Sequence, residues 1–431
     1  MTYQETIDYL YAHLPVFHRI GSKAFKPKLE NTQRLCEHLG NPHLKFKSIH
    51  IAGTNGKGSS SHYLAAILQA AGYKTGLYTS PHLKSFTERI RINGQAIPES
   101  RVVKYVEDNK SFIADLEPSF FECTVGLAFE YFAEQEVDIA IIEVGLGGRL
   151  DSTNVIYPEL SLITNISYDH VDILGDTLPK IAYQKAGIIK QDTPVVISQR
   201  HPETISVFME EATLQNAPIY FAEDSFYVEN SIFQSGGLQL SVNDKSNGIT
   251  INLTSELTGS YQKHNLQGVL EVIRVLNSMG NFTISNEAIK VGISQVVTLT
   301  NLKGRWQQLS QAPLTICDTG HNSAGIKELL SDLESIPKKS LWLVLGFVKD
   351  KDISGILDLL PKDANYIFCQ AQIMRALPAD ELANLALSKG LKGISIADVN
   401  RAIAFARQKA DKDDVIFIGG STFVVAEINE L

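Results

Sequence analysis

The sequence predicts an α/β protein of two domains, and three observations carry that prediction. An apolar, strand-like run ends at Ala52 in a glycine-rich loop that leads into a helical pattern. Strand-like and helix-like segments then alternate along the chain, and the alternation restarts near residue 305. We expect a larger domain at 1–296 with a mostly parallel sheet, a linker at 297–304 and a smaller α/β domain at 305–431.

The composition limits the class of protein. The 431 residues are 44% hydrophobic, enough for two or three cores. The net charge of −9 is spread along the chain without a basic stripe, which disfavours nucleic acid as a partner. No leader and no membrane-spanning apolar run is apparent, and four scattered cysteines favour a reducing compartment. We expect a cytoplasmic protein that binds no membrane, and a monomer because no oligomer interface is identifiable.

The stretch Ile51 to Ser59, I-A-G-T-N-G-K-G-S, predicts a phosphate-binding loop. Its three glycines can turn backbone N–H groups toward one point, and the helix N-terminus that follows favours negative charge. Its lysine adds a point charge and its serine a hydroxyl. The stretch departs from G-x-x-x-x-G-K-[ST], because Gly58 separates Lys57 from the hydroxyl. The strand-loop-helix context disfavours the alternative of a glycine-rich turn with a chance lysine.

Around this loop, the sequence predicts further elements. Residues 2–14 have helical periodicity. Residues 15–28 predict a basic loop with aromatic residues, which either covers the nucleotide pocket or simply connects to the next element. Residues 74–80 predict a strand that ends in T-S-P-H-L, and 86–94 alternate and turn at Asn-Gly as a hairpin. Hydroxyl groups at the carboxyl end of a strand are where an open α/β sheet places its ligands.

Two strand ends suggest a metal site. A buried parallel strand ends in Glu143, where a carboxylate is costly without a cation. His170 follows the next predicted strand, 159–166. Glu143 and His170 each have an ordinary structural explanation when considered alone, but together they could hold Mg²⁺ against the phosphates. Lys185 lies in a predicted helix, where a solvated lysine is the default.

The remaining chain predicts a small excursion and a second sheet. Residues 219–258 alternate in an antiparallel pattern, and helices follow at 259–279 and 286–296. The second domain has strand-like runs at 313–318, 341–346, 364–370 and 415–420. Its polar turns D-T-G-H-N and G-F-V-K-D-K-D each follow a strand, so both belong to the ligand-binding edge of that sheet.

Seven motifs, in order from Ala52 to Asn322, resemble those of the folylpolyglutamate synthase/dihydrofolate synthase family in the Mur ligase superfamily. They are A-G-T-N-G-K-G-S, Y-T-S-P-H-L, E-R-I-R-I-N-G, I-E-V-G-L-G-G-R-L-D-S-T-N, Y-D-H, Q-K-A-G-I-I-K and D-T-G-H-N. The loop that misfits the general pattern matches this family's version. The resemblance implies a P-loop-containing ATP-binding N-terminal domain and a Rossmann-like C-terminal ligase domain that closes on glutamate and nucleotide.

The resemblance also implies the chemistry. ATP would phosphorylate a carboxylate of folate or dihydropteroate, and the amino group of L-glutamate would displace phosphate from the acyl phosphate. Such transfer needs alignment and charge neutralisation more than a side-chain nucleophile. The implied catalytic residues are Lys57, His170 and Lys185, the last matching a lysine that is carbamylated in these ligases, and the implied magnesium ligands are Ser80, Glu143 and His170. The implied ATP contacts are Gly53, Thr54, Asn55, Gly56, Lys57, Gly58, Ser59, Asn265, Arg305, Asp318 and His321, and the implied substrate contacts are His82, Arg149 and Asp151.

The sequence leaves several alternative functions open. The motifs are shared by enzymes that make dihydrofolate, polyglutamates or both. A cell-wall precursor ligase is disfavoured by the G-K-G-S loop and because only Met1 to Lys45 precede the first strand. A nucleotide-driven switch explains the loop but not a complete second domain. Tyr168, Tyr261 and Lys303 depart from the family's usual residues, so the lining of the site and the linker geometry stay open.

Overall fold

The computed structural model describes residues 1–16, 28–234 and 237–431, which form two compact units. Unit 1 contains Met1–Glu256 and Gln262–Leu302, and unit 2 contains Leu257–Tyr261 and Lys303–Leu431. The second unit therefore takes a short segment from the middle of the chain as well as the C-terminal part.

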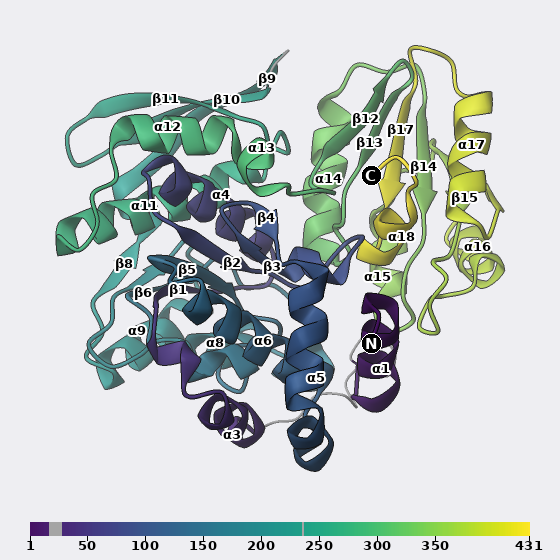
Figure 1. Cartoon of the computed structure of the whole chain (residues 1–431). Helices are drawn as coiled ribbons and strands as arrows, with labels where there is room; N and C mark the ends of the chain where they lie inside the picture. The colour runs from purple at the N-terminus through teal and green to yellow at the C-terminus, as the bar shows by residue number, and fades with distance from the viewer. Residues whose placement is uncertain (17–27, 235–236) are drawn as a thin grey trace. The chain divides into compact units, whose positions relative to one another are not determined.

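Unit 1 is built on an eight-stranded sheet of order β4-β3-β2-β5-β1-β6-β7-β8 (Figure 1). Six neighbouring strands from β2 to β8 are parallel, whereas β3 and β4 pair antiparallel at one edge. The central strands are rich in Ile, Leu and Val because helices cover both of their faces. The strands are β1 (Lys47–Ala52), β2 (Thr75–Tyr78), β3 (Ile90–Ile92), β4 (Gln95–Ala96), β5 (Ile139–Glu143), β6 (Leu160–Ile163), β7 (Val195–Ile197) and β8 (Ile219–Phe221).

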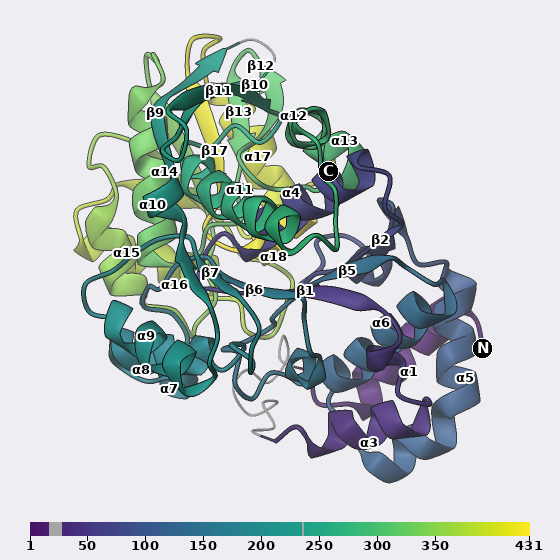
Figure 2. The ribbon, with the colours of Figure 1, turned by 90° about the vertical axis from the view of Figure 1, so that its left-hand side faces the viewer.

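Helices pack on both faces of this sheet (Figure 2). Helices α4 (Lys57–Ala70) and α11 (Gln262–Met279) cover one face, and α6 (Phe120–Glu134), α8 (Leu178–Ala186) and α9 (Ile205–Leu214) cover the other. The other helices are α1 (Tyr3–His13), α3 (Glu30–His38), α5 (Glu99–Leu116), α7 (Val171–Leu174), α10 (Ala222–Ser225), α12 (Asn286–Ser294) and α13 (Val296–Thr300), with 3₁₀ turns η2 (Pro42–Leu44), η3 (Phe86–Arg89) and η4 (Ser152–Val155).

The predicted antiparallel excursion is a separate three-stranded sheet of order β11-β10-β9. Its strands are β9 (Phe226–Gln234), β10 (Gly237–Asp244) and β11 (Ile249–Ser255). Leu238, Leu240 and Val242 alternate with polar residues along β10 and are buried, as expected for a sheet with one covered face.

Unit 2 is a six-stranded sheet of order β12-β13-β17-β14-β15-β16. All its strands are parallel except the edge strand β12. The strands are β12 (Gln307–Gln311), β13 (Leu314–Cys317), β14 (Leu341–Leu345), β15 (Asn365–Phe368), β16 (Gly393–Ser395) and β17 (Val415–Gly419); the helices are α14 (Ser323–Ser335), α15 (Ile353–Leu359), α16 (Ala379–Ser388), α17 (Val399–Lys409) and α18 (Thr422–Glu427).

The predicted fold class is confirmed, and the elements differ from prediction in detail. The predicted linker 297–304 begins within helix α13, and the division between the units falls after Leu302. The first part of 86–94 is the 3₁₀ turn η3, so the hairpin is shorter than its alternation suggests. The short edge strands β12 and β16 carry too few apolar residues to be recognised from sequence. Most of the predicted basic loop 15–28 lies outside the described residues.

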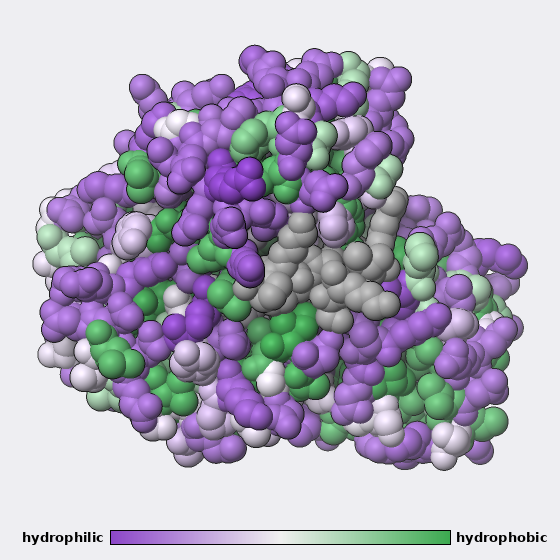
Figure 3. Space-filling view, turned by 90° about the horizontal axis from the view of Figure 1, so that it is seen from below, coloured by the Kyte–Doolittle hydropathy of each residue, from purple (hydrophilic) through white to green (hydrophobic). Residues whose placement is uncertain are grey.

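Among the described residues, no helix is long and apolar enough to cross a membrane. Hydrophilic residues predominate on the face shown in Figure 3, with small hydrophobic areas between them.

Candidate active site

The phosphate-binding loop joins β1 to α4 as predicted. Gly53 and Gly56 adopt positive φ angles of 149° and 86°, which favour glycine. A Cβ at Gly53 would lie 1.8 Å from Thr164 Oγ1, and one at Gly56 would lie 2.1 Å from Asn265 Oδ1. Glycine is therefore required at both positions by backbone conformation and by close neighbours.

The loop that follows β6 braces the phosphate-binding loop. The backbone N–H of Asn55 donates to Asn165 Oδ1 (2.9 Å), and the N–H of Thr54 donates to the Asn165 carbonyl oxygen (2.9 Å). Thr164 Oγ1 donates to the Asn55 carbonyl oxygen at 2.6 Å. Sequence reasoning missed Thr164 and Asn165, although polar side chains directly after a buried strand were the available signal. The pairing of β1 with β6 brings the two loops together.

Helix α11 contributes amide side chains to the same place. Gln262 Nε2 donates to Ser59 Oγ at 3.2 Å, and Asn265 Nδ2 donates to Gln262 Oε1 at 2.8 Å. Asn265 also lies against Gly56, because a Cβ atom added to Gly56 would come within 2.1 Å of Asn265 Oδ1. The predicted residue Asn265 thus lies beside the loop, although Ser59 and Gln262 are 203 residues apart in sequence.

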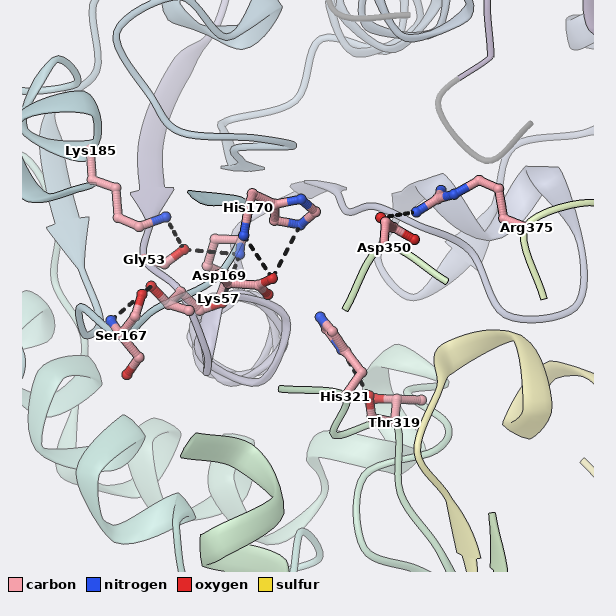
Figure 4. A network of polar contacts seen from close by, with 11 residues as sticks. Gly53, Lys57, Ser167, Asp169, His170, Lys185, Thr319, His321, Asp350 and Arg375 are labelled. Carbon is pink, nitrogen blue, oxygen red and sulfur yellow. Dashed lines mark hydrogen bonds and ion pairs between the residues drawn. The ribbon is translucent and has the colours of Figure 1, made fainter. Parts of the chain in front are cut away.

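Two lysines converge on one carbonyl oxygen of the loop (Figure 4). Lys57 Nζ donates to the carbonyl oxygens of Gly53 (3.0 Å) and Thr54 (3.1 Å), and Lys185 Nζ donates to that of Gly53 (2.8 Å). Lys185 is only 4% exposed. Burial, reinforced by the charge of Lys57, lowers the pKa of Lys185 to about 7. The expectation that Lys185 is exposed to solvent is therefore wrong. Near neutral pH its amine is partly neutral and partly protonated.

The predicted metal ligands lie at or after the carboxyl ends of β2, β5 and β6, and His170 directly precedes α7. Glu143 ends β5 and is 4% exposed, and its Oε2 accepts a hydrogen bond from the backbone N–H of Ser80 at 3.2 Å. His170 lies 3.8 Å, through Nε2, from Asp169 Oδ1, and its backbone N–H donates to the same oxygen at 2.9 Å (Figure 4). Ser80 and Glu143 are thus adjacent, whereas the imidazole of His170 is turned to its neighbour.

The three predicted substrate residues make internal contacts in unit 1. Arg149 Nη2 donates to Glu211 Oε2 at 2.7 Å, and its guanidinium lies 4.1 Å from the Tyr183 ring centroid. Asp151 Oδ2 accepts from Leu146 N–H at 2.8 Å, and burial raises the pKa of Asp151. These contacts organise the glycine-rich loop after β5.

His82 is the third predicted substrate residue and has a different environment. Its Nδ1 accepts a hydrogen bond from Arg89 Nε at 2.8 Å. Its ring lies edge-on to Phe86, with centroids 6.3 Å apart. A substrate role for all three residues stays a prediction.

In unit 2, the D-T-G-H-N turn follows β13 at the carboxyl edge of the sheet. Asp318 Oδ2 accepts from Tyr261 OH (2.7 Å) and from Trp306 N–H (2.6 Å), and burial raises the pKa of Asp318. His321 Nδ1 lies 3.1 Å from the Thr319 carbonyl oxygen (Figure 4), and Arg305 Nη1 donates to Thr319 Oγ1. The three predicted contacts in unit 2 are therefore clustered around one turn.

Two family models match the chain in agreement with this division. The Mur ligase middle domain matches residues 51–273, and the Mur ligase glutamate ligase domain matches residues 304–422. A Bacillus subtilis dihydrofolate synthase/folylpolyglutamate synthase is 32% identical, over 94% of this chain and 95% of the relative. The chain belongs to the folylpolyglutamate synthase/dihydrofolate synthase family. It spans half the length of a Haloferax volcanii relative, a probable bifunctional folylpolyglutamate synthase/dihydropteroate synthase that is 32% identical over 99% of this chain.

Solved structures of the family share the fold. An Escherichia coli FolC structure in complex with DHPP and ADP has a TM-score of 0.85 and 29% identity, covering 99% of this chain and 96% of that one. A bifunctional folylpolyglutamate synthase/dihydrofolate synthase with Mn, AMPPNP and L-glutamate bound has a TM-score of 0.82 and 28% identity, covering 99% and 97%. This ligase family therefore accounts for the phosphate-binding loop and for the second α/β unit.

The residues beside the phosphate-binding loop include oxygen donors that fit a divalent cation. Among the described residues, no group of three or more His, Cys, Asp or Glu side chains could hold a metal ion. The adjacent Ser80 and Glu143 offer oxygen atoms beside the phosphate-binding loop. Mg²⁺ typically takes one or two protein carboxylates and completes its coordination with phosphates and water. A single carboxylate, Glu143, with the neighbouring Ser80 beside a phosphate-binding loop is consistent with such a magnesium site.

Proposed function

We infer that the protein is an ATP-dependent ligase that joins L-glutamate to a carboxylate of folate or dihydropteroate. The γ-phosphoryl group of ATP passes to that carboxylate, and the glutamate amine then attacks the acyl phosphate and releases phosphate. The observation that carries this function is the braced loop Gly53–Ser59 in a chain that matches this ligase family over nearly its whole length.

The protein's part in phosphoryl transfer is alignment and charge neutralisation. Backbone N–H groups at the start of α4 and the Lys57 ammonium group bind the β- and γ-phosphates. The rigid attachment of the loop to Asn165 and to Asn265 holds these donors in place. A divalent cation, for which Ser80, Glu143 and His170 are the predicted ligands, supplies neutralisation of phosphate charge.

The nucleotide and glutamate contacts in unit 2 are part of the proposal. Arg305, Asp318 and His321 are grouped around one turn at the carboxyl edge of the sheet, the usual ligand-binding edge. Asp318 already accepts three hydrogen bonds within unit 2, from Tyr261, Trp306 and Gly320. We therefore assign Asp318 to shaping the turn, and Arg305 and His321 to ligand contact.

We also propose that Lys185 is carbamylated. A pKa of about 7 leaves much of its amine neutral at physiological pH, and a neutral amine adds to CO₂, forming an N–C bond and releasing one proton. The product is an anion beside Lys57, which relieves the repulsion between two ammonium groups at Gly53. Carbon NMR with labelled bicarbonate should show a carbamate resonance that is lost in Lys185→Arg. No resonance in the active wild-type enzyme would refute the modification.

We propose a cytoplasmic monomer. The four cysteines are all free and buried, as expected for a chain from a reducing compartment. Analytical ultracentrifugation of the purified protein tests the oligomeric state, and a dimer at micromolar concentration would contradict it.

The function is tested by the substrates that ATP turnover requires. Phosphate release should need glutamate together with dihydropteroate or a folate monoglutamate, because acyl phosphate forms only on the pterin-containing acid. Release that is equally fast without either substrate, or that needs a muramyl nucleotide, would refute the proposal. The lengths of the products made from dihydropteroate and from the monoglutamate then separate the dihydrofolate and polyglutamate activities.

A further inference from the structure

The hydroxyl group of Thr54, in the phosphate-binding loop, bonds both backbone groups of one residue in the loop after β6. Thr54 Oγ1 donates to the Ser167 carbonyl oxygen at 3.1 Å, and the Ser167 N–H donates to Thr54 Oγ1 at 3.1 Å (Figure 4). The Thr54 N–H donates to the Asn165 carbonyl oxygen at 2.9 Å, and the Thr54 carbonyl oxygen accepts from Lys57 Nζ at 3.1 Å. Every polar group of Thr54 therefore already has a partner within unit 1.

These contacts continue the pairing of β1 with β6 beyond the two strands. In a parallel ladder, the N–H and C=O of one residue bond two residues of the neighbouring strand that lie on either side of its partner. Thr54 bonds Asn165 and Ser167, which have that spacing. The acceptor for the Ser167 N–H, however, is the Thr54 hydroxyl group instead of the Thr54 carbonyl oxygen. The side chain thus replaces a backbone group of the ladder, and the carbonyl oxygen is left to the ammonium group of Lys57.

The residue that this hydroxyl group holds begins the turn that carries a predicted metal ligand. Ser167 lies three residues before His170, which has a positive φ of 50° and directly precedes α7. A left-handed conformation at a residue other than glycine persists only where the surrounding structure maintains it. The bonds to Thr54 give this turn a fixed point at its start, and that point belongs to the phosphate-binding loop.

We propose that Thr54 is a positioning residue, whose hydroxyl group fixes the segment 167–170 relative to the phosphate-binding loop. It thereby supports divalent-cation binding through His170 and makes no side-chain contact with ATP. The motif alone places Thr54 among the ATP contacts, but a hydroxyl group has one proton to donate, and Thr54 donates it to Ser167. This proposal rests on the proposed function and gives one residue of the nucleotide loop a separate part in it.

The test separates binding of the cation from binding of the nucleotide. Thr54→Val keeps the shape of the side chain and removes its hydroxyl group. Electron paramagnetic resonance measures Mn²⁺ binding in the presence of AMPPNP, and calorimetry in EDTA measures AMPPNP binding without metal. The Mn²⁺ affinity of Thr54→Val should fall about 10-fold, as on loss of a group that orients a metal ligand. Its metal-free affinity for AMPPNP should equal that of the wild type.

Two further variants distinguish positioning from a general loss of stability. Thr54→Ser keeps a hydroxyl group and should restore the Mn²⁺ affinity. Thr75→Val is the matched control, because the Thr75 hydroxyl group donates to the Tyr73 carbonyl oxygen at the start of β2, and it should bind Mn²⁺ as the wild type does. Equal losses in Thr54→Val and Thr75→Val, or no rescue by serine, would overturn the positioning role.

Hydrogen exchange followed by NMR tests the contact without any ligand. The Ser167 amide should exchange slowly in the wild type, because its N–H is bonded to Thr54 Oγ1. It should exchange faster in Thr54→Val, whereas the amides of β6 keep their protection. The wild-type measurement suffices if Thr54→Val does not fold, since unprotected exchange of the Ser167 amide in the wild type would refute the contact and the proposal with it.

The remaining outcomes separate this inference from the proposed function. Weaker metal-free binding of AMPPNP to Thr54→Val would overturn the assignment and make Thr54 a nucleotide contact. An unchanged Mn²⁺ affinity in that variant would overturn it as well. Failure of the wild type to bind AMPPNP, with metal or without it, would instead contradict the proposed function.

Discussion

Lys57 and Lys185 show how one residue changes the chemistry of its neighbour. Both ammonium groups donate to the Gly53 carbonyl oxygen, and Lys185 is enclosed by protein. Burial disfavours the charged form, and the second positive charge adds to that effect. The Lys185 amine is therefore partly neutral near pH 7, which is the state that the proposed carbamylation requires.

Lys57→Ala is expected to abolish ligation without unfolding the protein. Loss of one preorganised charge at a transferring phosphoryl group costs about 10²–10³ in kcat, while the partly exposed side chain contributes little to the core. Steady-state phosphate release and circular dichroism measure the two effects. Lys180→Ala is the control, because Lys180 is 63% exposed and pairs with Asp176 on the surface. Wild-type rates in Lys57→Ala would contradict the assignment of the phosphate-binding loop.

Lys185 makes the stability of the unmodified protein depend on pH. Its folded pKa of about 7 lies below the ordinary lysine value of 10.5, so between these values the unfolded chain binds more protons and stability rises with pH. In CO₂-free buffer, the rise from pH 7 to pH 9 should reach about 2 kcal/mol, at about 1.4 kcal/mol per pH unit above the folded pKa. Urea unfolding of wild type and Lys185→Met should show this rise only in the wild type. Parallel curves would contradict a depressed pKa.

The element that carries the site is the unit of strand, loop and helix from β1 to α4, held from two sides. The loop after β6 fixes Thr54 and Asn55, and α11 places Asn265 against Gly56. The loop has a positive-φ glycine where each neighbour approaches. Its geometry therefore depends on contacts with both neighbouring elements as well as on its own sequence.

Gly56→Ala should weaken ATP binding and destabilise the protein by about 1–3 kcal/mol, through backbone strain and displacement of Asn265. Gly72→Ala is the matched control, because Gly72 also has a positive φ but its built Cβ meets nothing within 4 Å. Calorimetric titration with ATP and thermal unfolding should show strain in both variants and loss of ATP binding only in Gly56→Ala. Equal ATP affinity in the two variants would show that the contact with Asn265 is unimportant.

At the scale of the whole molecule, the chain crosses between two units that each have their own core. The segment Leu257–Tyr261 belongs to unit 2, where Tyr261 donates to Asp318, and the next residue begins helix α11 of unit 1. Tyr261 and Gln262 are thus consecutive residues anchored to different units, one at the D-T-G-H-N turn and the other at the phosphate-binding loop.

Tyr261→Phe should destabilise unit 2 alone. The change removes one donor from the buried Asp318 carboxylate, at a cost of about 1–3 kcal/mol. Both tryptophans, Trp306 and Trp342, belong to unit 2, so tryptophan fluorescence reports its unfolding. Tyr63→Phe is the control, because the Tyr63 hydroxyl bonds Ser255 inside unit 1. The fluorescence midpoint should fall in Tyr261→Phe and stay unchanged in Tyr63→Phe; equal shifts would mean that the units unfold together.

The sequence by itself determined the features that depend on neighbouring residues. The turn at Gly53 and Gly56, the helix that begins at Lys57 and the strand that ends in Glu143 follow from local conformational preference and hydrophobic pattern. Seven motifs in the expected order were also sufficient to indicate the family. The tertiary structure alone decided that Lys185 is buried, that Asn165 braces the loop and that Asn265 lies against Gly56. Burial and long-range hydrogen bonds depend on strand order, here β2-β5-β1-β6, which joins residues that are distant in sequence.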